Sequence, residues 1–177
     1  MSRFQPRQLN EHTTKLVIGT SRTKYIKSNE VGAAVHSYRG ASLLELCNLV
    51  ERYPTRKINT LTIIAGFNDH RDTVSSFIDN WKFLIQLVYL KFNPSNLIIP
   101  KTISTSNNHF INRKIEKLNF ALHNLLCSLN LPIISPNLNR DFDDAIFSRD
   151  GIHFSRFGNF IFTCILKFYF KFFDNVI

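Results

Sequence analysis

The stretch KLVIGTSRTKYIK, residues 15–27, decides how the rest of the sequence is interpreted. Its apolar run, residues 16–18, is typical of a buried strand, and it stops at a glycine, a threonine and Ser21 before the chain becomes basic. These residues have two interpretations. They form a tight turn of no chemical interest, or they hold Ser21 at the end of a sheet to carry out a reaction.

Apolar runs and helical patterns alternate along the rest of the chain. Further strands are expected at residues 33–38, 61–66, 96–100 and 131–135, and helices at 42–53, 72–92, 112–130 and 155–173. Asp72 is expected to cap its helix, and residues 136–153 are expected to form a loop. This alternation predicts an α/β fold, a three-layer α/β/α sandwich with a five-stranded parallel sheet of the flavodoxin-like kind.

The size of the chain bounds its organisation. It has 177 residues, of which 44% are hydrophobic and 20% charged, as expected of one globular domain. We expect residues 1–14 to form a short N-terminal lead and residues 15–177 a single domain.

The cysteines and the N-terminal residues bear on the compartment. Cys47, Cys127 and Cys164 are odd in number and lack metal-ligand spacing, which favours free thiols in a reducing compartment. The first residues contain no apolar segment typical of a signal peptide. We therefore expect an intracellular protein of the cytoplasm, with the nucleus as the alternative.

The net charge of +9, from 22 Lys and Arg against 13 Asp and Glu, attracts polyanions such as nucleic acid or acidic lipid. The positive residues are spread along the chain, with short clusters at residues 22–27 and 113–117. A solvated surface explains this distribution as well. Arg22, Lys24 and Arg39 are expected to flank the candidate pocket, either attracting an anionic substrate or simply facing solvent.

The last predicted helix is rich in phenylalanine on two sides. It contains Lys167 and Lys171 and is shorter than the ~20 apolar residues that span a membrane, so we expect no integral span. Packing in the core is the expected use, and a partner or lipid surface is the alternative for its outer side.

Chemically useful residues follow the predicted strands. Because ligands of open parallel sheets bind at the carboxyl ends of the strands, these residues are expected to converge. Ser21 would attack a carbonyl carbon, His153 would take its proton, and Asp150 would orient the imidazole. The backbone N–H groups of Ser21 and Gly40 and the side-chain amide of Asn68 would form an oxyanion hole.

The motifs GTS, RGAS, GFND and DGIH, which hold Ser21, Gly40, Asn68 and His153, resemble the blocks of the SGNH (GDSL-type) hydrolases in order and spacing. The sequence around Ser21 and Gly40 also resembles esterase-like domains of some retrotransposons. The resemblance implies an esterase or deacetylase acting on ester or acetyl-ester substrates, including lipids and acetylated sugars. Thr20 stands where that family usually has Asp, which affects the loop geometry more than the class of reaction.

Other interpretations stay open. A non-catalytic module of the same fold could bind nucleic acid through its basic surface, with Arg113, Lys114 and Lys117 as its candidate residues. His70 beside two aspartates suggests metal ligands, but nothing completes the set, so a loop is the preferred interpretation and no metal or cofactor is implied. Asp69 is expected to hydrogen-bond backbone groups in that loop.

Overall fold

The sheet carries the architecture of this computed structural model, which describes residues 4–138 and 144–174. Its strands are β1 (Lys15–Gly19), β2 (Ala34–Ser37), β3 (Thr60–Ile64), β4 (Asn96–Ile98) and β5 (Ile133–Ile134). They pair in parallel in the order β2-β1-β3-β4-β5. This is the flavodoxin-like order, which reverses its winding direction between β1 and β3. The predicted five-stranded parallel sheet is confirmed.

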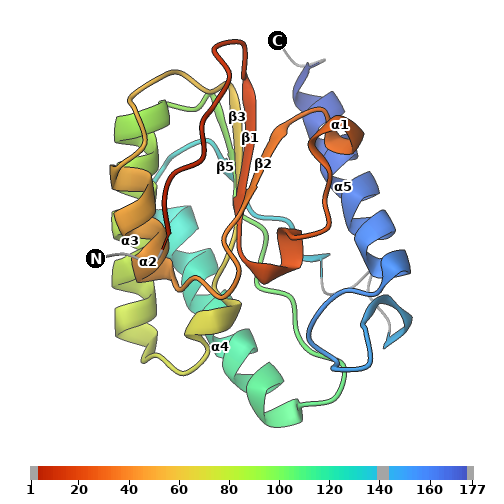
Figure 1. The fold of residues 1–177 in the computed structure, drawn as a ribbon. Helices are drawn as coiled ribbons and strands as arrows, with labels where there is room; N and C mark the ends of the chain where they lie inside the picture. The colour runs from red at the N-terminus through yellow and green to blue at the C-terminus, as the bar shows by residue number, and fades with distance from the viewer. Residues whose placement is uncertain (1–3, 139–143, 175–177) are drawn as a thin grey trace.

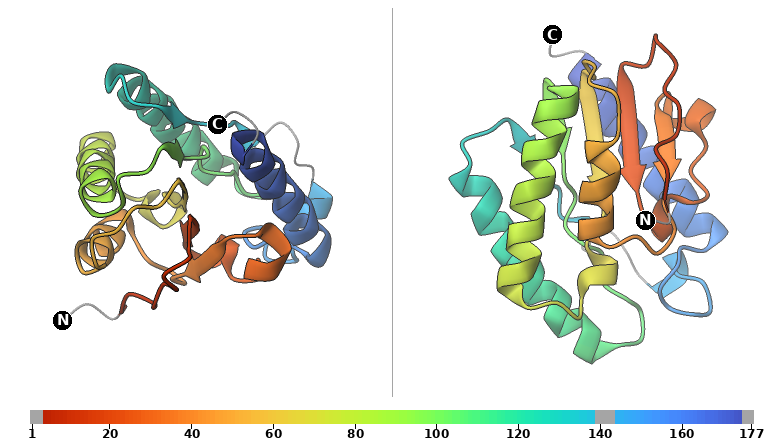
Figure 2. Two further views of the ribbon diagram at one scale, coloured as in Figure 1. Left: turned by 90° about the horizontal axis from the view of Figure 1, so that it is seen from above. Right: turned by 60° about the vertical axis from the view of Figure 1, so that its left-hand side comes forward.

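Helices cover both faces of the sheet (Figures 1 and 2). One face carries α2 (Leu43–Glu51), α3 (Val74–Phe92) and α4 (His109–Ser128), and the other carries α1 (Ser28–Val31) and α5 (Arg156–Asp174). The three layers predicted from the sequence are therefore confirmed.

The two hydrophobic cores are divided by the alternation of side chains along the strands. On β1, Leu16 and Ile18 pack in the core beneath α2, α3 and α4, whereas Val17 packs in the core beneath α5. This follows from the two-residue period of a strand. Every residue of β3 is buried, as expected of a central strand covered on both faces.

Four local details differ from the predictions. Thr73, not Asp72, caps α3, because its side chain accepts a hydrogen bond from Ser76 N, while the N–H of Asp72 closes a turn on the carbonyl of Asp69. Helix α4 begins one turn earlier than predicted because Asn108 caps it. The four-residue helix α1 was not predicted. The predicted loop 136–153 contains a short 3₁₀ helix (Asp144–Ile146), and residues 139–143 lie outside the described residues.

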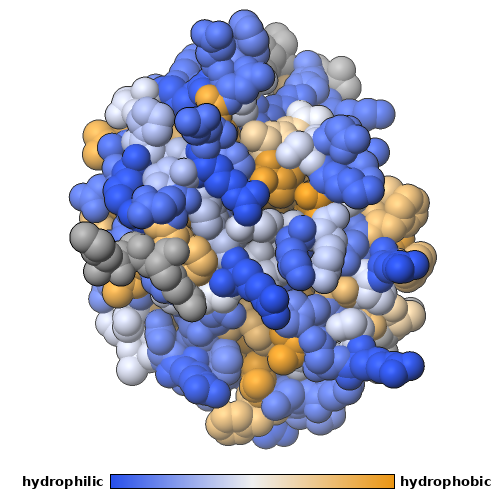
Figure 3. Space-filling view, in the orientation of Figure 1, coloured by the Kyte–Doolittle hydropathy of each residue, from blue (hydrophilic) through white to orange (hydrophobic). Residues whose placement is uncertain are grey.

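Helix α5 uses one of its two apolar sides for the core. Phe162, Leu166 and Phe170 are buried against the sheet, so the expected core packing is confirmed. Four phenylalanines of the helix stay exposed, and hydrophobic side chains appear between hydrophilic ones on the right-hand side of Figure 3. These four are Phe157, Phe160, Phe168 and Phe172. In the part of the chain that is described, no helix is both long and apolar enough to cross a membrane.

Candidate active site

Ser21 begins a short 3₁₀ helix, η1 (Ser21–Thr23), directly after β1. A Cβ atom at Gly19 would overlap the Thr23 side chain, so only glycine allows this close approach. The Thr23 hydroxyl donates to the carbonyl of Thr20 at 2.9 Å and closes the turn. Ser21 is left half-buried at the carboxyl edge of the sheet.

Asp150 and His153 form a hydrogen-bonded pair in the loop before α5. Asp150 Oδ2 lies 2.6 Å from His153 Nδ1, and Oδ1 accepts from the Ser148 hydroxyl at 2.8 Å and from the N–H groups of Ile152 and His153, both at 2.9 Å. Burial alone would raise the pKa of Asp150, but these hydrogen bonds hold it well below its ordinary value. Asp150 is therefore a carboxylate, which can only accept, so Nδ1 of His153 carries the hydrogen and Nε2 is free to take a proton.

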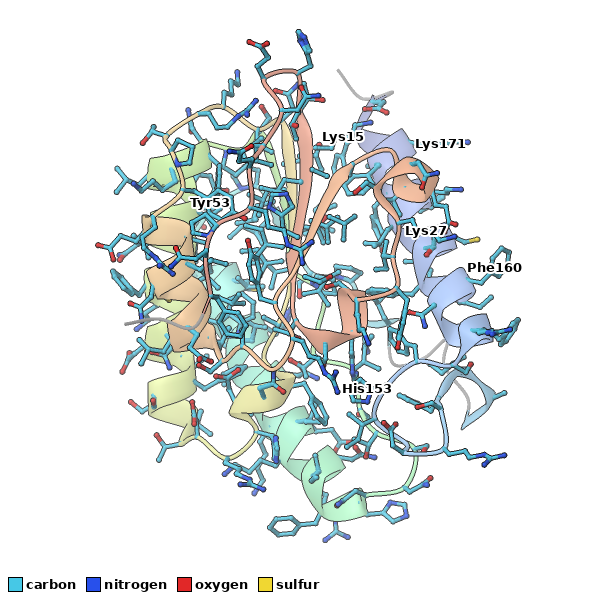
Figure 4. All side chains as sticks on the ribbon, viewed as in Figure 1. Lys15, Lys27, Tyr53, His153, Phe160 and Lys171 are labelled. Atoms are coloured by element: carbon cyan, nitrogen blue, oxygen red, sulfur yellow. The ribbon has the colours of Figure 1, made fainter. Side chains whose placement is uncertain are left out.

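One cavity of about 200 Å³ brings Ser21 and this pair together. It lies at the opposite end of the sheet from Lys15, the first residue of β1, as the position of His153 in Figure 4 shows. Its lining consists of Ser21, Lys24, Tyr25, Arg39, Ser148, Asp150, His153 and Phe154. Lys24 and Arg39 thus lie where the sequence predicted, and their two positive charges outweigh the one carboxylate of the lining, Asp150.

Gly40 and Asn68 follow the next two strands of the same edge. Gly40 has a φ of 74°, a left-handed conformation that glycine adopts without strain. Asn68 lies in η2 (Phe67–Asp69), and its Nδ2 donates to the carbonyl of Ala41 at 2.8 Å. That bond ties the two loops together and leaves the second N–H of the amide for another acceptor. Neither Gly40 nor Asn68 is part of the cavity lining.

Asp69 is buried and holds the start of α2. Its Oδ1 accepts from Leu43 N at 2.8 Å, so Asp69 does bond to the backbone, but at the start of α2 and not within its own loop as predicted. Burial raises the pKa of Asp69 to about 6, although the hydrogen bond from Leu43 acts in the opposite direction. This carboxyl therefore titrates close to physiological pH.

Arg22 does not flank the pocket, so that expectation was wrong: its side chain is buried. Its guanidinium donates to the carbonyl oxygens of Ile103, at 2.6 Å, and Ser104, at 3.2 Å. It lies 4.6 Å from the ring centre of Phe67 and 5.6 Å from that of Phe154. Burial lowers its pKa to about 9, opposed by the Asp150 carboxylate, so it stays charged at neutral pH. The only signal of this burial in the sequence was that a phenylalanine stands next to Asn68 and another next to His153.

The side chains of His70 and Asp69, near Asn68, are engaged with the backbone. His70 Nδ1 lies 2.8 Å from the carbonyl oxygen of Phe67, and Asp69 holds Leu43 N. Within residues 4–138 and 144–174, no three His, Cys, Asp or Glu side chains form a group that could hold a metal ion.

A larger cavity of about 640 Å³ lies along the edge strand β2 and also contains a serine and histidines. Its Ser28 hydroxyl accepts from Val35 N, and the Nδ1 of its His36 lies 2.6 Å from the Tyr53 hydroxyl. Both groups are therefore engaged in holding the fold, and the chemistry favours the smaller cavity at the carboxyl edge.

Comparison with known proteins identifies relatives by fold and not by sequence. No family model and no curated protein matches the chain. Solved structures do match, among them a carbohydrate esterase family 3 protein from Talaromyces cellulolyticus, with a TM-score of 0.74 and 13% identity, covering 93% of this chain and 100% of that one. A GDSL-like lipase from Bacteroides thetaiotaomicron has a TM-score of 0.69 and 14% identity, covering 89% and 88%. An acetylxylan esterase from Geobacillus stearothermophilus has a TM-score of 0.65 and 13% identity, covering 86% and 91%.

These matches extend across the chain, which therefore has the fold of the SGNH (GDSL-type) hydrolases. At these identities the likeness concerns the fold. The narrower resemblance to retrotransposon domains is not supported by the matches.

Proposed function

We propose that the protein is a serine hydrolase that cleaves carboxylic esters through an acyl-enzyme on Ser21. One observation carries the proposal: Ser21 shares a cavity with His153, whose Nδ1 is hydrogen-bonded to a strongly ionised Asp150. The fold, which is shared with esterases and lipases, supports it.

In this mechanism His153 Nε2 accepts the hydroxyl proton of Ser21 as Oγ attacks the carbonyl carbon. Asp150 stabilises the imidazolium that forms. The carbon–oxygen bond to the alcohol breaks, and the alcohol oxygen takes the proton from Nε2. Water activated by His153 then hydrolyses the acyl-enzyme and restores Ser21. The N–H groups of Ser21 and Gly40 and the free amide N–H of Asn68 are the proposed donors to the oxyanion.

Acetyl esters are the proposed substrates, by analogy with the acetylxylan esterase and the carbohydrate esterase of the same fold. The three thiols are all free, which fits a reducing compartment such as the cytoplasm.

Labelling with a fluorophosphonate probe tests the proposal, because it requires an activated hydroxyl. We expect the label on Ser21 and none after Ser21→Ala or His153→Ala. Ser75→Ala is the control, since Ser75 lies near a carboxylate, Asp79, on α3 but lines no part of the cavity. Absence of label on Ser21 in the folded wild type, together with no turnover of acetyl esters, would refute the proposal.

The alternative, a nucleic-acid-binding module, is favoured by a different surface. Lys114 and Arg71 line a cavity of about 400 Å³ together with Phe110, whose side chain is 82% exposed. A basic groove with an accessible aromatic ring is typical of single-strand binding. Salt-dependent retention of single-stranded RNA that is lost in Lys114→Ala but kept in Ser21→Ala would support this alternative, and no retention at low salt would remove it.

A further inference from the structure

A second, larger groove opens beside the catalytic cavity. Its volume is about 790 Å³, within the range of small-molecule sites. Tyr25, Ser148 and Phe154 line both spaces, so the groove is continuous with the cavity that holds Ser21 and His153. The rest of its lining comes from the end of the loop before α5, the first two turns of α5, α1 and the residue before α1: Lys27, Glu30, Ser155, Arg156, Asn159, Phe160 and Thr163. Figure 4 shows Lys27 and Phe160 on the same side of the molecule.

The groove combines aromatic walls with unbalanced positive charge. The side chains of Tyr25 and Phe160 are 58% and 63% exposed, which leaves large apolar surfaces available to a ligand. Lys27 is paired with Glu30 at 3.0 Å. Arg156, in contrast, makes no ion pair with any described residue. A ligand that is apolar in its body and carries a negative charge would satisfy both features.

The position of the groove indicates which part of an ester it would hold. His153 must return its proton to the leaving alcohol oxygen, so the alcohol lies on the His153 side of the nucleophile. The groove begins there, at Phe154 and at Ser148, the residue that donates to Asp150. Gly40 and Asn68, the proposed oxyanion donors, line no part of it. The carbonyl oxygen would therefore point away from the groove and the alcohol into it.

We infer that this groove is the binding site for the alcohol portion of the substrate, and that the preferred alcohol is bulky, apolar and anionic. The inference rests on the proposed hydrolase function. During acylation the bond between Ser21 Oγ and the acyl carbon forms, the bond from that carbon to the alcohol oxygen breaks, and His153 Nε2 protonates the departing alcohol within the groove.

Acetyl esters that differ only in their alcohol test the inference. Ethyl acetate and 2-(2-naphthyl)ethyl acetate share the acyl group, so their kcat/KM ratio reports on the alcohol site. We expect Phe160→Ala to lower the ratio of the kcat/KM for the naphthylethyl ester to that for the ethyl ester by about tenfold.

Phe168→Ala is the matched control. Phe168 is 65% exposed on the same helix, but it does not line the groove, so the ratio should not change. An equal effect of the two substitutions, or no effect of Phe160→Ala, would overturn the inference.

The charge is tested by a sulfonate on the naphthyl ring. Arg156→Gln should lower the ratio of the kcat/KM for the sulfonated ester to that for the uncharged naphthylethyl ester by about threefold. Lys167→Gln, on the same helix but outside the groove, should leave this ratio unchanged. An unchanged preference in Arg156→Gln would overturn the anionic part of the inference.

Direct binding separates failure of the groove from failure of the proposed hydrolase. If the wild type hydrolyses none of these esters, saturation-transfer NMR with sulfonated 2-(2-naphthyl)ethanol still reports on the groove. Binding that is weakened by Phe160→Ala and not by Phe168→Ala would support the site, and no binding would overturn it.

Discussion

The proposed acid–base loop, which carries Asp150 and His153, and the proposed oxyanion loops, which carry Gly40 and Asn68, lie at the same edge of the sheet, but they are held by different kinds of contact. Among the described residues, the hydrogen bonds to Asp150 all come from within three positions of it. Asn68, in contrast, bonds to Ala41, 27 residues away, and Asp69 bonds to Leu43, 26 residues away. The contacts that hold Asp150 are thus local, although the carbonyl of Gly151 in the same loop accepts from Ser106 N at 3.0 Å. The contacts of Asn68 and Asp69 depend on two segments being brought together by the sheet.

Arg22 connects the two sides. Its guanidinium lies against Phe67, the neighbour of Asn68, and against Phe154, the neighbour of His153. A buried cation next to Ser21 therefore contacts both halves of the site. Substitutions in each half, and in this connection, should have effects of different size.

Substitution of the acid–base pair should give the largest effect. Asp150→Asn keeps the size of the side chain but removes the charge that stabilises the imidazolium and selects its tautomer. We expect kcat for an acetyl ester to fall by about 10³- to 10⁴-fold with little change in the melting temperature.

Ser148→Ala provides the graded comparison, because it removes one of the hydrogen bonds to Asp150 and leaves the contact with His153. Its kcat should stay within about tenfold of the wild type. Activity of Asp150→Asn in that same range would show that the loop does not work as an acid–base unit.

Substitution on the oxyanion side should have a smaller effect on rate. Asn68→Ala removes one proposed donor, and we expect kcat to fall by about 10²- to 10³-fold while KM changes little. Since the variant also loses the bond to Ala41, thermal unfolding should be measured alongside, and a moderate fall in melting temperature is expected. A change in KM alone would contradict a role in stabilising the transition state.

The difference between the two loops also explains what the sequence could predict. The spacing of Asp150 and His153 is enough to anticipate their contact, since the groups bonded to Asp150 lie within three positions of it, although their catalytic roles stay a prediction. The apolar runs likewise predicted the strands, because burial on both faces leaves few alternatives.

The contacts that the sequence did not predict depend on the tertiary structure. Arg22 looked like a surface residue, and only the packing of Phe67 and Phe154 around it explains its burial. Nothing in the sequence indicated that the side-chain amide of Asn68 would donate to the carbonyl of Ala41. Thr73 caps α3 in place of Asp72, since the backbone N–H of Asp72 belongs to the preceding turn.

Arg22→Lys tests the connection between the loops. Lysine keeps the charge but loses the planar group that lies against the two rings and donates to two carbonyl oxygens. We expect a loss of about 3 kcal/mol in the free energy of unfolding and a lower kcat with an unchanged pH profile.

Arg149→Lys is the matched control for this change, because Arg149 is exposed in the acid–base loop. It should leave both quantities unchanged. A kcat for Arg22→Lys that equals the wild-type value would show that the buried cation does not position the two loops.

The pH dependence of stability gives the smallest of these effects, and it involves Asp69 and a second buried group, His36. Burial, assisted by Arg7, lowers the pKa of His36 from 6.5 to about 4, so protonation of His36 favours the unfolded state and stability falls as the pH drops from 6.5 toward 4. Burial raises the pKa of Asp69 from 3.8 to about 6, so its protonation favours the folded state and stability rises as the pH drops from 6 toward 3.8.

The two contributions oppose each other in the wild type and separate in variants. In Asp69→Asn the effect of His36 is left alone, and the free energy of unfolding should decrease by roughly 2–3 kcal/mol more than in the wild type between neutral pH and pH 4. In His36→Gln only the effect of Asp69 is left, so over the same pH range the free energy of unfolding should decrease less than in the wild type. Urea unfolding at several pH values measures both, and parallel profiles for the wild type and Asp69→Asn would contradict the assignment. Because Asp69 holds Leu43 beside the oxyanion loop, such a shift would also show that the long-range half of the site is the half that responds to mild acid.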